Sequence, residues 1–257
     1  PRLAHLANRF GYRSEPALPA WLGWTLALVP GRREHLEWSV LELRSEWRGP
    51  LLDVGCGSGG TLRLMRELGW DAEGIDLDPQ AIAVANHAGL RARVGTFESS
   101  ELPERHYAAV TSIHVIEHVD DPAAFLRHCR RVLRPGGRVA LTTPNAASLG
   151  SRVFGSRWRG LEPPRHFQVF TAAGLAHLAR EAGFESVRVR TSARLAAAIV
   201  RESLQPGLAT GTQARSAGPP LRVLASAFQM AERALLPFWR EAGEELLLSA
   251  QAPGGRA

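Results

Sequence analysis

Three histidines and one glycine-rich loop are the parts of this 257-residue sequence whose residue types could carry out chemistry. His114 and His118 stand close together in the segment HVIEH, and His166 follows two prolines in the segment PPRHF. The imidazole side chain titrates near neutral pH, so each histidine could accept a proton from a reacting group. Each could equally fix a turn or a loop through structural hydrogen bonds, and both interpretations remain open.

The glycine-rich loop lies in residues 51–60, LLDVGCGSGG, and follows an apolar segment that reads as a strand. Gly55, Gly57 and Gly59 let the backbone turn sharply and approach a ligand, and the start of the following helix offers free N–H groups. The loop also fits the pattern GxGxxG. Alone, therefore, it does not separate a dinucleotide site from an S-adenosylmethionine site.

An acidic residue stands at the end of the next predicted strand. The segment DAEGIDL, residues 71–77, contains Asp76, which lies about 20 residues beyond the first loop glycine, where an acidic side chain can accept hydrogen bonds from both ribose hydroxyls. Asp78 then reads as the N-cap of a helix over residues 79–88, with Pro79 at its first position.

Strands and helices alternate through the rest of this region, with short connections. Further strands are expected at residues 91–97, 107–113 and 138–144, and a further helix from residue 122 to about 133, capped by Asp121 and stopped by Pro135-Gly136-Gly137. This alternation is typical of a parallel sheet with helices on both faces. The sequence therefore predicts an α/β fold.

The segments LLDVGCGSGG, GIDLDP, SIHVIEHVDDP and LRPGGRVALTTPN, in this order and spacing, resemble the class I S-adenosylmethionine-dependent methyltransferases. Together with EPPRHFQVF and the helix expected at residues 171–182, they are most similar to the branch of ubiquinone-type and natural-product O-methyltransferases. The resemblance covers residues 51–191 and a last strand near 245–250. It implies a doubly wound, Rossmann-like sheet of seven strands in the order 3-2-1-4-5-7-6, with strand 7 antiparallel between strand 5 and a strand at residues 186–191.

The resemblance also implies a division of the chain. The expected parts are an N-terminal helical cap at residues 1–49, a methyltransferase core at 50–192, a helical insertion at 193–243 with a flexible linker near 205–220, and a final core strand and tail at 244–257. In the cap, the apolar residues 17–30 are too few to span a bilayer. They read either as a helix packed on the core or as a wall of an apolar substrate pocket.

The insertion contains a periodic apolar pattern. Residues at three- and four-residue steps form an amphipathic stripe: Leu221, Leu224, Phe228, Ala231, Leu235 and Trp239. We expect this stripe to pack on the core or on a partner chain in a homodimer. Contact with a membrane surface is the less favoured alternative.

The resemblance implies S-adenosyl-L-methionine as cofactor. Asp53 and the loop should hold its methionine end, Asp76 its ribose, and Leu77 its adenine face. Thr96 and Phe97 should meet the adenine edge, although many family members have Asp in place of Thr96. The expected cofactor-binding residues are therefore Asp53, Gly55, Cys56, Gly57, Gly59, Asp76, Leu77, Thr96, Phe97 and His114.

The expected catalytic residues are His114, His166 and His118. His114 follows the fourth strand, at the sheet edge where ligands bind, and is the first candidate for general base. His166 is the second, and His118 should help to shape the site. A divalent ion held by Glu117, Asp120 and Asp121 is a less favoured alternative, because Asp121 reads as a helix cap; no metal is predicted.

The leading functional hypothesis is O-methylation of a small-molecule hydroxyl in a biosynthetic pathway. Methylation of a nitrogen, carbon, sulfur or carboxylate acceptor is a second hypothesis. A third is an inactive cofactor-binding or interaction module that works through its amphipathic C-terminal region.

Composition disfavours other classes of protein. The formal net charge is +6, but the sequence contains no lysine and its arginines are scattered, so nucleic acid is not an expected partner. Two cysteines suffice for neither a disulfide framework nor a metal cluster, and no secretory signal pattern is present. A cytoplasmic location is expected.

Overall fold

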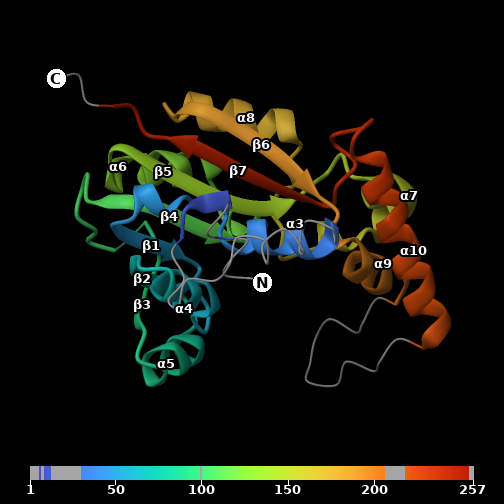
Figure 1. Ribbon diagram of the computed structural model, residues 1–257, viewed down its shortest axis with the longest axis horizontal. Helices are drawn as coiled ribbons and strands as arrows, with labels where there is room; N and C mark the ends of the chain where they lie inside the picture. Colours follow the sequence, from blue (N-terminus) through green and yellow to red (C-terminus); the bar gives the residue numbers. More distant parts are fainter. Residues whose placement is uncertain (1–5, 7–8, 13–29, 99, 206–217, 255–257) are drawn as a thin grey trace.

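The computed structural model describes residues 6, 9–12, 30–98, 100–205 and 218–254 (Figure 1). The expected cap segment at residues 17–29 and most of the expected linker near 205–220 lie outside these residues.

The sheet has seven strands in the order β3-β2-β1-β4-β5-β7-β6. β7 runs antiparallel to both of its neighbours, with Leu248 opposite Leu141 of β5 and Val189 of β6. The predicted strand order and the antiparallel seventh strand are thus confirmed. The strands are β1 Pro50–Val54, β2 Asp71–Asp76, β3 Arg91–Val94, β4 Tyr107–Ile113, β5 Leu133–Pro144, β6 Glu185–Ser192 and β7 Glu245–Gln251.

Two strand boundaries differ from the prediction. β3 ends at Val94 because the backbone turns at Gly95, whose N–H donates to the carbonyl of Asp76 (3.0 Å), so Thr96 and Phe97 lie in a loop. β5 begins at Leu133 and passes through the Pro-Gly-Gly segment, because a bulge of extra residues in β5 lets Leu133 pair with Tyr107 while Arg138 pairs with Ala109.

Helices begin where the sequence offers caps. The side chains of Asp78, Asp121 and Thr171 each accept a hydrogen bond from a backbone N–H of the first helical turn, at 2.8, 2.8 and 3.1 Å. The helices are α3 Pro30–Ser39, α4 Gly60–Glu67, α5 Pro79–His87, α6 Pro122–Val132, α7 Leu149–Phe154, α8 Ala172–Glu181, α9 Ala196–Leu204 and α10 Pro219–Leu235. Short 3₁₀ turns occupy Ser45–Trp47, Ile116–His118, Gly155–Arg157 and Arg159–Leu161.

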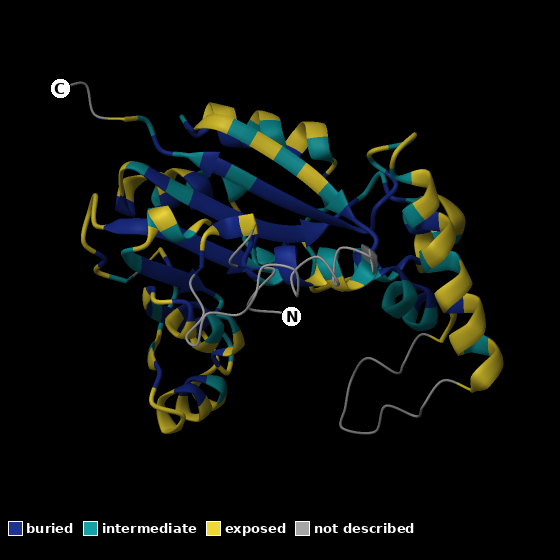
Figure 2. Ribbon diagram, in the orientation of Figure 1, coloured by how far each residue is buried: buried dark blue, intermediate teal, exposed yellow. Residues whose placement is uncertain are grey.

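Helices cover both faces of the sheet. Successive side chains of each strand point to opposite faces, so each strand contributes apolar side chains to both layers. Leu52 belongs to a hydrophobic cluster that includes Phe125 of α6 and Leu175 of α8. Its neighbour Leu51 belongs to a second cluster, which includes Leu62 of α4 and Ile82 of α5. The strands in the middle of the sheet are accordingly buried (Figure 2).

Three helices stand beyond one edge of the sheet. β7 is antiparallel to β5 and β6, so the carboxyl ends of those two strands meet its amino end at one edge. The helices α7 and α9 follow β5 and β6, and α10 precedes β7. All three therefore gather at the carboxyl edge, where an α/β sheet binds its ligands (Figure 1).

The predicted stripe of α10 is only partly its packing face. Ala225 and Glu232 are fully buried. Leu221 and Phe228 of the stripe are half-buried, whereas Leu224 and Leu235 of the stripe are exposed. The inward face is fixed by polar contacts. Gln229 donates to the backbone carbonyls of residues 193 and 194 (2.8 and 2.9 Å), and Glu232 accepts from the backbone N–H of Glu244 (3.0 Å).

Glu232 predicts a pH-dependent stability. Burial and the neighbouring Glu244 raise its pKa to about 9, so the folded protein holds it protonated at neutral pH. An acid whose pKa is raised on folding contributes stability at low pH, and this contribution is lost as pH rises from its ordinary pKa towards 9. The free energy of unfolding should therefore fall over about pH 5–9, and E232Q should flatten this fall. Denaturant titrations at several pH values measure the free energy of unfolding, with the exposed Glu101→Gln as control. If the free energy of unfolding of E232Q falls with pH as steeply as that of the unmodified protein, the raised pKa of Glu232 is contradicted.

Candidate functional site

A cavity of about 750 Å³ opens at the carboxyl ends of β1, β2 and β4. Seven of the residues predicted for the site line it: Gly55, Asp76, Leu77, Thr96, Phe97, His114 and His118. The other predicted residues are not among those that line it: Asp53, Cys56, Gly57, Gly59 and His166.

Two loop glycines show what the loop does. Gly55 has φ +72°, and a Cβ there would clash with the side chain of Val115, so the loop packs too closely for a side chain. Gly57 has φ +51°, and a Cβ at this position would meet no atom within 4 Å, so its backbone is open to a ligand. Cys56 is buried under the loop and faces Gly74 of β2.

Asp76 is held at the rim of the cavity. One carboxylate oxygen accepts from the N–H of Gly57 (2.8 Å) and the other from the N–H of Asp78 (2.9 Å). These contacts fix the carboxylate between the loop and α5, with further lone pairs available for hydroxyl donors. The next residue, Leu77, is 68% exposed, an unusual value for leucine that suits contact with a flat apolar group.

Asp53 lies below the loop and is almost fully buried. It accepts a hydrogen bond from the hydroxyl of Thr111 at 2.7 Å. Burial raises its pKa to about 7, against the effect of this hydrogen bond, and the charge of Asp76 adds to the increase. A cation bound near Asp53 would therefore favour its ionised form.

His114 uses both of its ring nitrogens in hydrogen bonds. Nδ1 lies 3.1 Å from Glu117 and Nε2 lies 2.9 Å from Glu245, and both carboxylates are fully buried. Burial alone would lower the pKa of His114, but the two carboxylates raise it to about 9. At neutral pH the ring is a cation with both N–H groups engaged. This arrangement disfavours His114 as a general base and makes it a link between two acidic side chains.

The link continues on both sides of His114. The hydroxyl of Thr143 donates to Glu117 at 2.9 Å, and the guanidinium of Arg194 donates to Glu245 at 2.7 Å. Although burial opposes it, the hydrogen bonds from His114 and Arg194 lower the pKa of Glu245. Sequence reasoning missed Arg194 and Glu245, since neither belongs to a recognisable motif.

His118 and His166 have a different environment. Nδ1 of His118 lies 2.8 Å from the carbonyl of Arg165, and Nδ1 of His166 lies 2.7 Å from the carbonyl of Gly160. A carbonyl only accepts, so each Nδ1 carries the proton and each Nε2 keeps a lone pair in the neutral ring. Burial lowers the pKa of His166, as does the nearby His118. The two rings meet edge to face, with centroids 4.7 Å apart.

The same region contains a set of possible metal ligands. Among the described residues, Glu117, His118 and His166 form a group whose ligand-type atoms lie within 4.8 Å of one another. Imidazole and carboxylate ligands suit divalent transition metals. Both oxygens of Glu117, however, already accept hydrogen bonds. The alternative cluster considered from the sequence differs, because Asp121 caps α6.

Comparison with known proteins places this site in a family. A family profile described as a methyltransferase domain matches residues 31–189. A protein named ubiquinone biosynthesis O-methyltransferase, from Xanthomonas euvesicatoria pv. vesicatoria, is 33% identical over 198 residues, which cover 72% of this chain and 79% of that protein.

Solved structures share the fold. Phosphoethanolamine N-methyltransferase 2 of Haemonchus contortus, in complex with S-adenosyl-L-methionine, is 18% identical with a TM-score of 0.55, covering 80% of this chain and 49% of that chain. The [4+2]-cyclase SpnF is 24% identical with a TM-score of 0.57, and the match covers 87% of this chain and 82% of that chain. The family profile matches more than half of the sequence, and the sheet has the strand order expected for this family. The chain therefore belongs to the class I S-adenosylmethionine-dependent methyltransferases.

Proposed function

We propose that the protein transfers the methyl group of S-adenosylmethionine to a hydroxyl oxygen of a small molecule in a biosynthetic pathway. The observation that carries the proposal is the pair His118 and His166, whose Nδ1 atoms are bound to backbone carbonyls, so that each neutral ring has a lone pair on Nε2. Nε2 of His166 also lies 3.5 Å from the carboxylate of Glu162. A hydroxyl must lose its proton during methylation, and a neutral imidazole is suited to take it.

The cavity fits the cofactor. Asp76 offers a fixed carboxylate for the ribose hydroxyls, Leu77 an exposed apolar surface for the adenine, and Gly57 an open backbone at the loop. S-Adenosylmethionine supplies an electrophilic methyl group on a sulfonium. The protein must then align the acceptor with that group and exclude competing water.

Nε2 of His118 or of His166 would receive the proton of the acceptor hydroxyl. The cationic His114 would hold Glu117 and Glu245 in place, and thereby the 3₁₀ turn that carries His118. We further propose that α7, α9 and α10, which stand at the carboxyl edge, contribute to the cap over the acceptor.

Two alternatives differ in the bond that forms. Methylation of nitrogen is represented among the similar folds by the phosphoethanolamine N-methyltransferase, and a cyclisation reaction by the [4+2]-cyclase. The relatives with about one third sequence identity are named O-methyltransferases, which favours oxygen.

Transfer of a ¹³C-labelled methyl group separates these possibilities. The protein is incubated with methyl-labelled cofactor and a panel of phenols, quinols, sugar hydroxyls, amines and carboxylic acids, and the products are examined by NMR. A carbon signal in the O-methyl range, in a phenol, quinol or sugar product, is the expected result. Signals only from N-methyl products, or no transfer to any acceptor, would overturn the proposal.

Cofactor binding should also release a proton. The bound sulfonium and ammonium groups favour the carboxylate of Asp53, whose pKa in the free protein is about 7. At about pH 7, binding should therefore release roughly half a proton per site. Calorimetry in two buffers of different ionisation enthalpy measures the number of protons released, because the observed binding enthalpy then depends on the buffer. In Asp53→Asn this dependence should vanish; buffer-independent enthalpies in the unmodified protein would refute the linkage.

A further inference from the structure

The outward face of α10 is apolar along its length. Val223, Met230 and Phe238, at the helix and just beyond it, are 69%, 70% and 89% exposed. Steps of seven and eight residues place them on one side, together with the exposed alanines 227, 231 and 234 between them. Since the opposite side is anchored through Gln229 and Glu232, this apolar side cannot turn inward.

A neighbouring helix extends the apolar face. Phe154, at the end of α7, packs against Phe228 with ring centroids 5.8 Å apart. Val153, next to it, is 57% exposed. We call the exposed apolar residues of α7 and α10 the outer face: Val153, Val223, Leu224, Met230, Leu235 and Phe238. Continuous apolar surface of this kind marks an interaction site more often than scattered single residues do.

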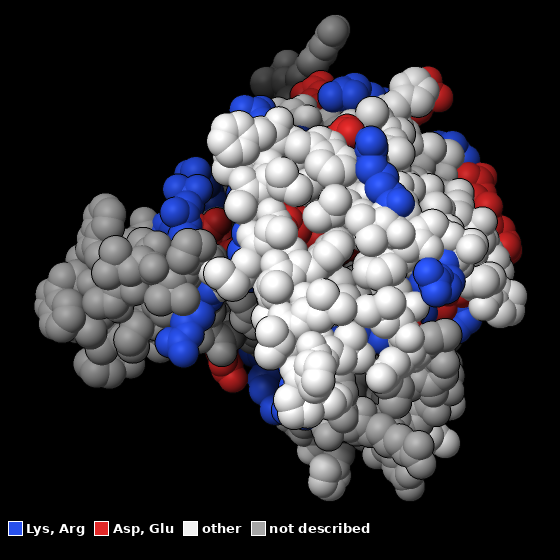
Figure 3. Space-filling view, turned by 90° about the vertical axis from the view of Figure 1, so that its right-hand side faces the viewer, with Lys and Arg blue, Asp and Glu red and all other residues white. Residues whose placement is uncertain are grey.

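The exposed charge of α10 itself is positive, and the half-buried Glu241 follows residues 219–240. From residue 219 to 240 the one acidic residue is Glu232, which is fully buried. Arg222 is exposed, and the guanidinium of Arg152 lies over Trp239 at 4.7 Å. Arg240 lines the cavity on the inner side of α10. Figure 3 shows a wide uncharged surface at this end of the molecule, with arginines and some acidic side chains at its margins.

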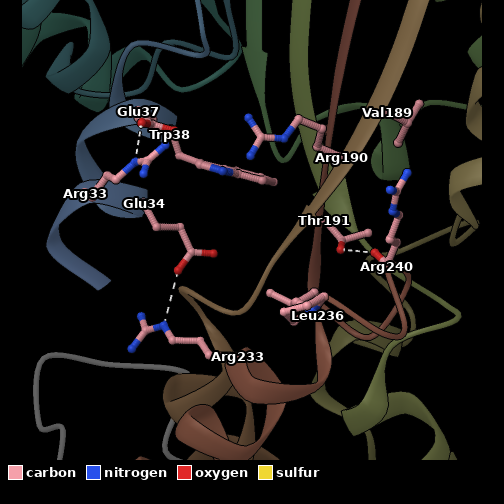
Figure 4. A pocket seen from close by; sticks show the side chains of 11 residues that line it. Arg33, Glu34, Glu37, Trp38, Val189, Arg190, Thr191, Arg233, Leu236 and Arg240 are labelled. Carbon is pink, nitrogen blue, oxygen red and sulfur yellow. Dashed lines mark hydrogen bonds and ion pairs between the residues drawn. The ribbon is translucent and has the colours of Figure 1, made fainter. Parts of the chain in front are cut away.

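The remaining arginine of α10 faces a cavity of about 680 Å³ between α3, β6 and α10. Arg233 is paired there with Glu34 of α3 at 3.3 Å, and Arg33 with Glu37 at 2.9 Å (Figure 4). The Arg233–Glu34 pair holds α10 against α3, whereas the Arg33–Glu37 pair lies within α3. Together with the hydrogen bonds of Gln229 and Glu232, the Arg233–Glu34 pair fixes the orientation in which the helix presents the outer face.

The charge pattern indicates what kind of partner binds to the outer face. In a two-fold dimer, the outer face would meet its own copy, and the arginines of both copies would approach each other without an exposed acid on α10 to offset them. A bilayer that contains anionic lipids offers an apolar interior beside negative headgroups. We propose that the outer face binds the surface of an anionic lipid bilayer, with Met230 and Phe238 entering the headgroup boundary and the arginines contacting phosphates.

This mode of binding agrees with the rest of the fold. Among the described residues, no helix is both long and apolar enough to cross a bilayer, so contact would be confined to the surface. The helices α7 and α10 lie at the carboxyl edge of the sheet, so docking would turn the edge that carries the cavity towards the lipid. The inference is independent of which atom is methylated.

Cosedimentation of the full chain with vesicles tests the proposal. Vesicles of phosphatidylcholine with phosphatidylglycerol are compared with vesicles of phosphatidylcholine alone. Binding to the anionic vesicles, weakened by salt, is expected. M230E should lower the partition coefficient about tenfold, since it replaces an inserted apolar side chain with a charge. R222E should lower it through charge alone. The matched control is Val84→Glu on α5, where valine is 58% exposed and far along the chain from the outer face.

Each variant is first shown to keep its thermal unfolding and cofactor affinity. No binding to anionic vesicles, equal binding to both vesicle types, or binding that M230E and V84E weaken equally would overturn the proposal. Light scattering supplies a further test: a dimer that M230E dissociates would assign the outer face to a second copy of the chain and overturn the lipid assignment.

Discussion

Replacement of His166 by alanine is expected to lower turnover by about 10²–10⁴-fold while the affinity for S-adenosylmethionine changes little. The side chain is largely buried and does not line the cofactor cavity; its Nδ1 is bound to a backbone carbonyl, and its Nε2 lies 3.5 Å from the carboxylate of Glu162. Its removal should therefore affect proton transfer and spare cofactor binding. His118→Ala should reduce turnover in the same range, with a larger effect on cofactor affinity because His118 lines the cavity.

The pH profile follows from the lowered pKa of His166. A general base works in its deprotonated form, so activity should be lost only as pH falls through a pKa below that of ordinary histidine, and should be level above about pH 7. Steady-state rates on the acceptor identified by label transfer give the measurement, with the exposed His177→Ala of α8 as control.

Two results would contradict the base assignment. One is turnover within about threefold of the unmodified protein for both single variants at every pH, which would leave proximity alone as the source of the rate. The other is loss of activity on chelation, with recovery on addition of a divalent cation. That result would assign the Nε2 atoms of His118 and His166 to a metal.

Asp76→Ala should weaken the binding of S-adenosylhomocysteine by about 1.5–3 kcal/mol, or roughly 10–150-fold. The variant removes a charged acceptor from the ribose site and leaves the N–H of Gly57 without its partner. Calorimetric titration measures the change. Asp71→Ala is the matched control, because Asp71 lies at the opposite end of β2, is exposed and is paired with Arg91. Equal affinities in the two variants would contradict the role of Asp76.

The sheet could be predicted because its determinants are local. Apolar runs define the strands, and side chains such as Asp78 and Asp121 cap the helices as expected. The seventh strand could be placed as well, since the resemblance supplied its position. The start of β5 could not be predicted, because the strand continues through Pro135 only with the help of a bulge in β5 itself.

The site was less predictable, for two physical reasons. Glu245 lies 131 residues from His114 and reaches it only because β7 enters beside the end of β5. The two carboxylates then give His114 a charge that no local pattern reveals. The orientation of α10 about its own axis could not be predicted for a similar reason. Periodicity indicated an amphipathic helix, but the hydrogen bonds of Gln229 and Glu232 decide which side is buried.

A crystal structure with S-adenosylhomocysteine and a phenolic acceptor bound would test the proposed site most directly. The expected result has the ribose hydroxyls on Asp76, and the acceptor oxygen within about 3 Å of Nε2 of His118 or His166, directly or through one water. A cofactor bound outside the 750 Å³ cavity would contradict the assignment of the site. An acceptor oxygen remote from both histidines would contradict the proposed chemistry.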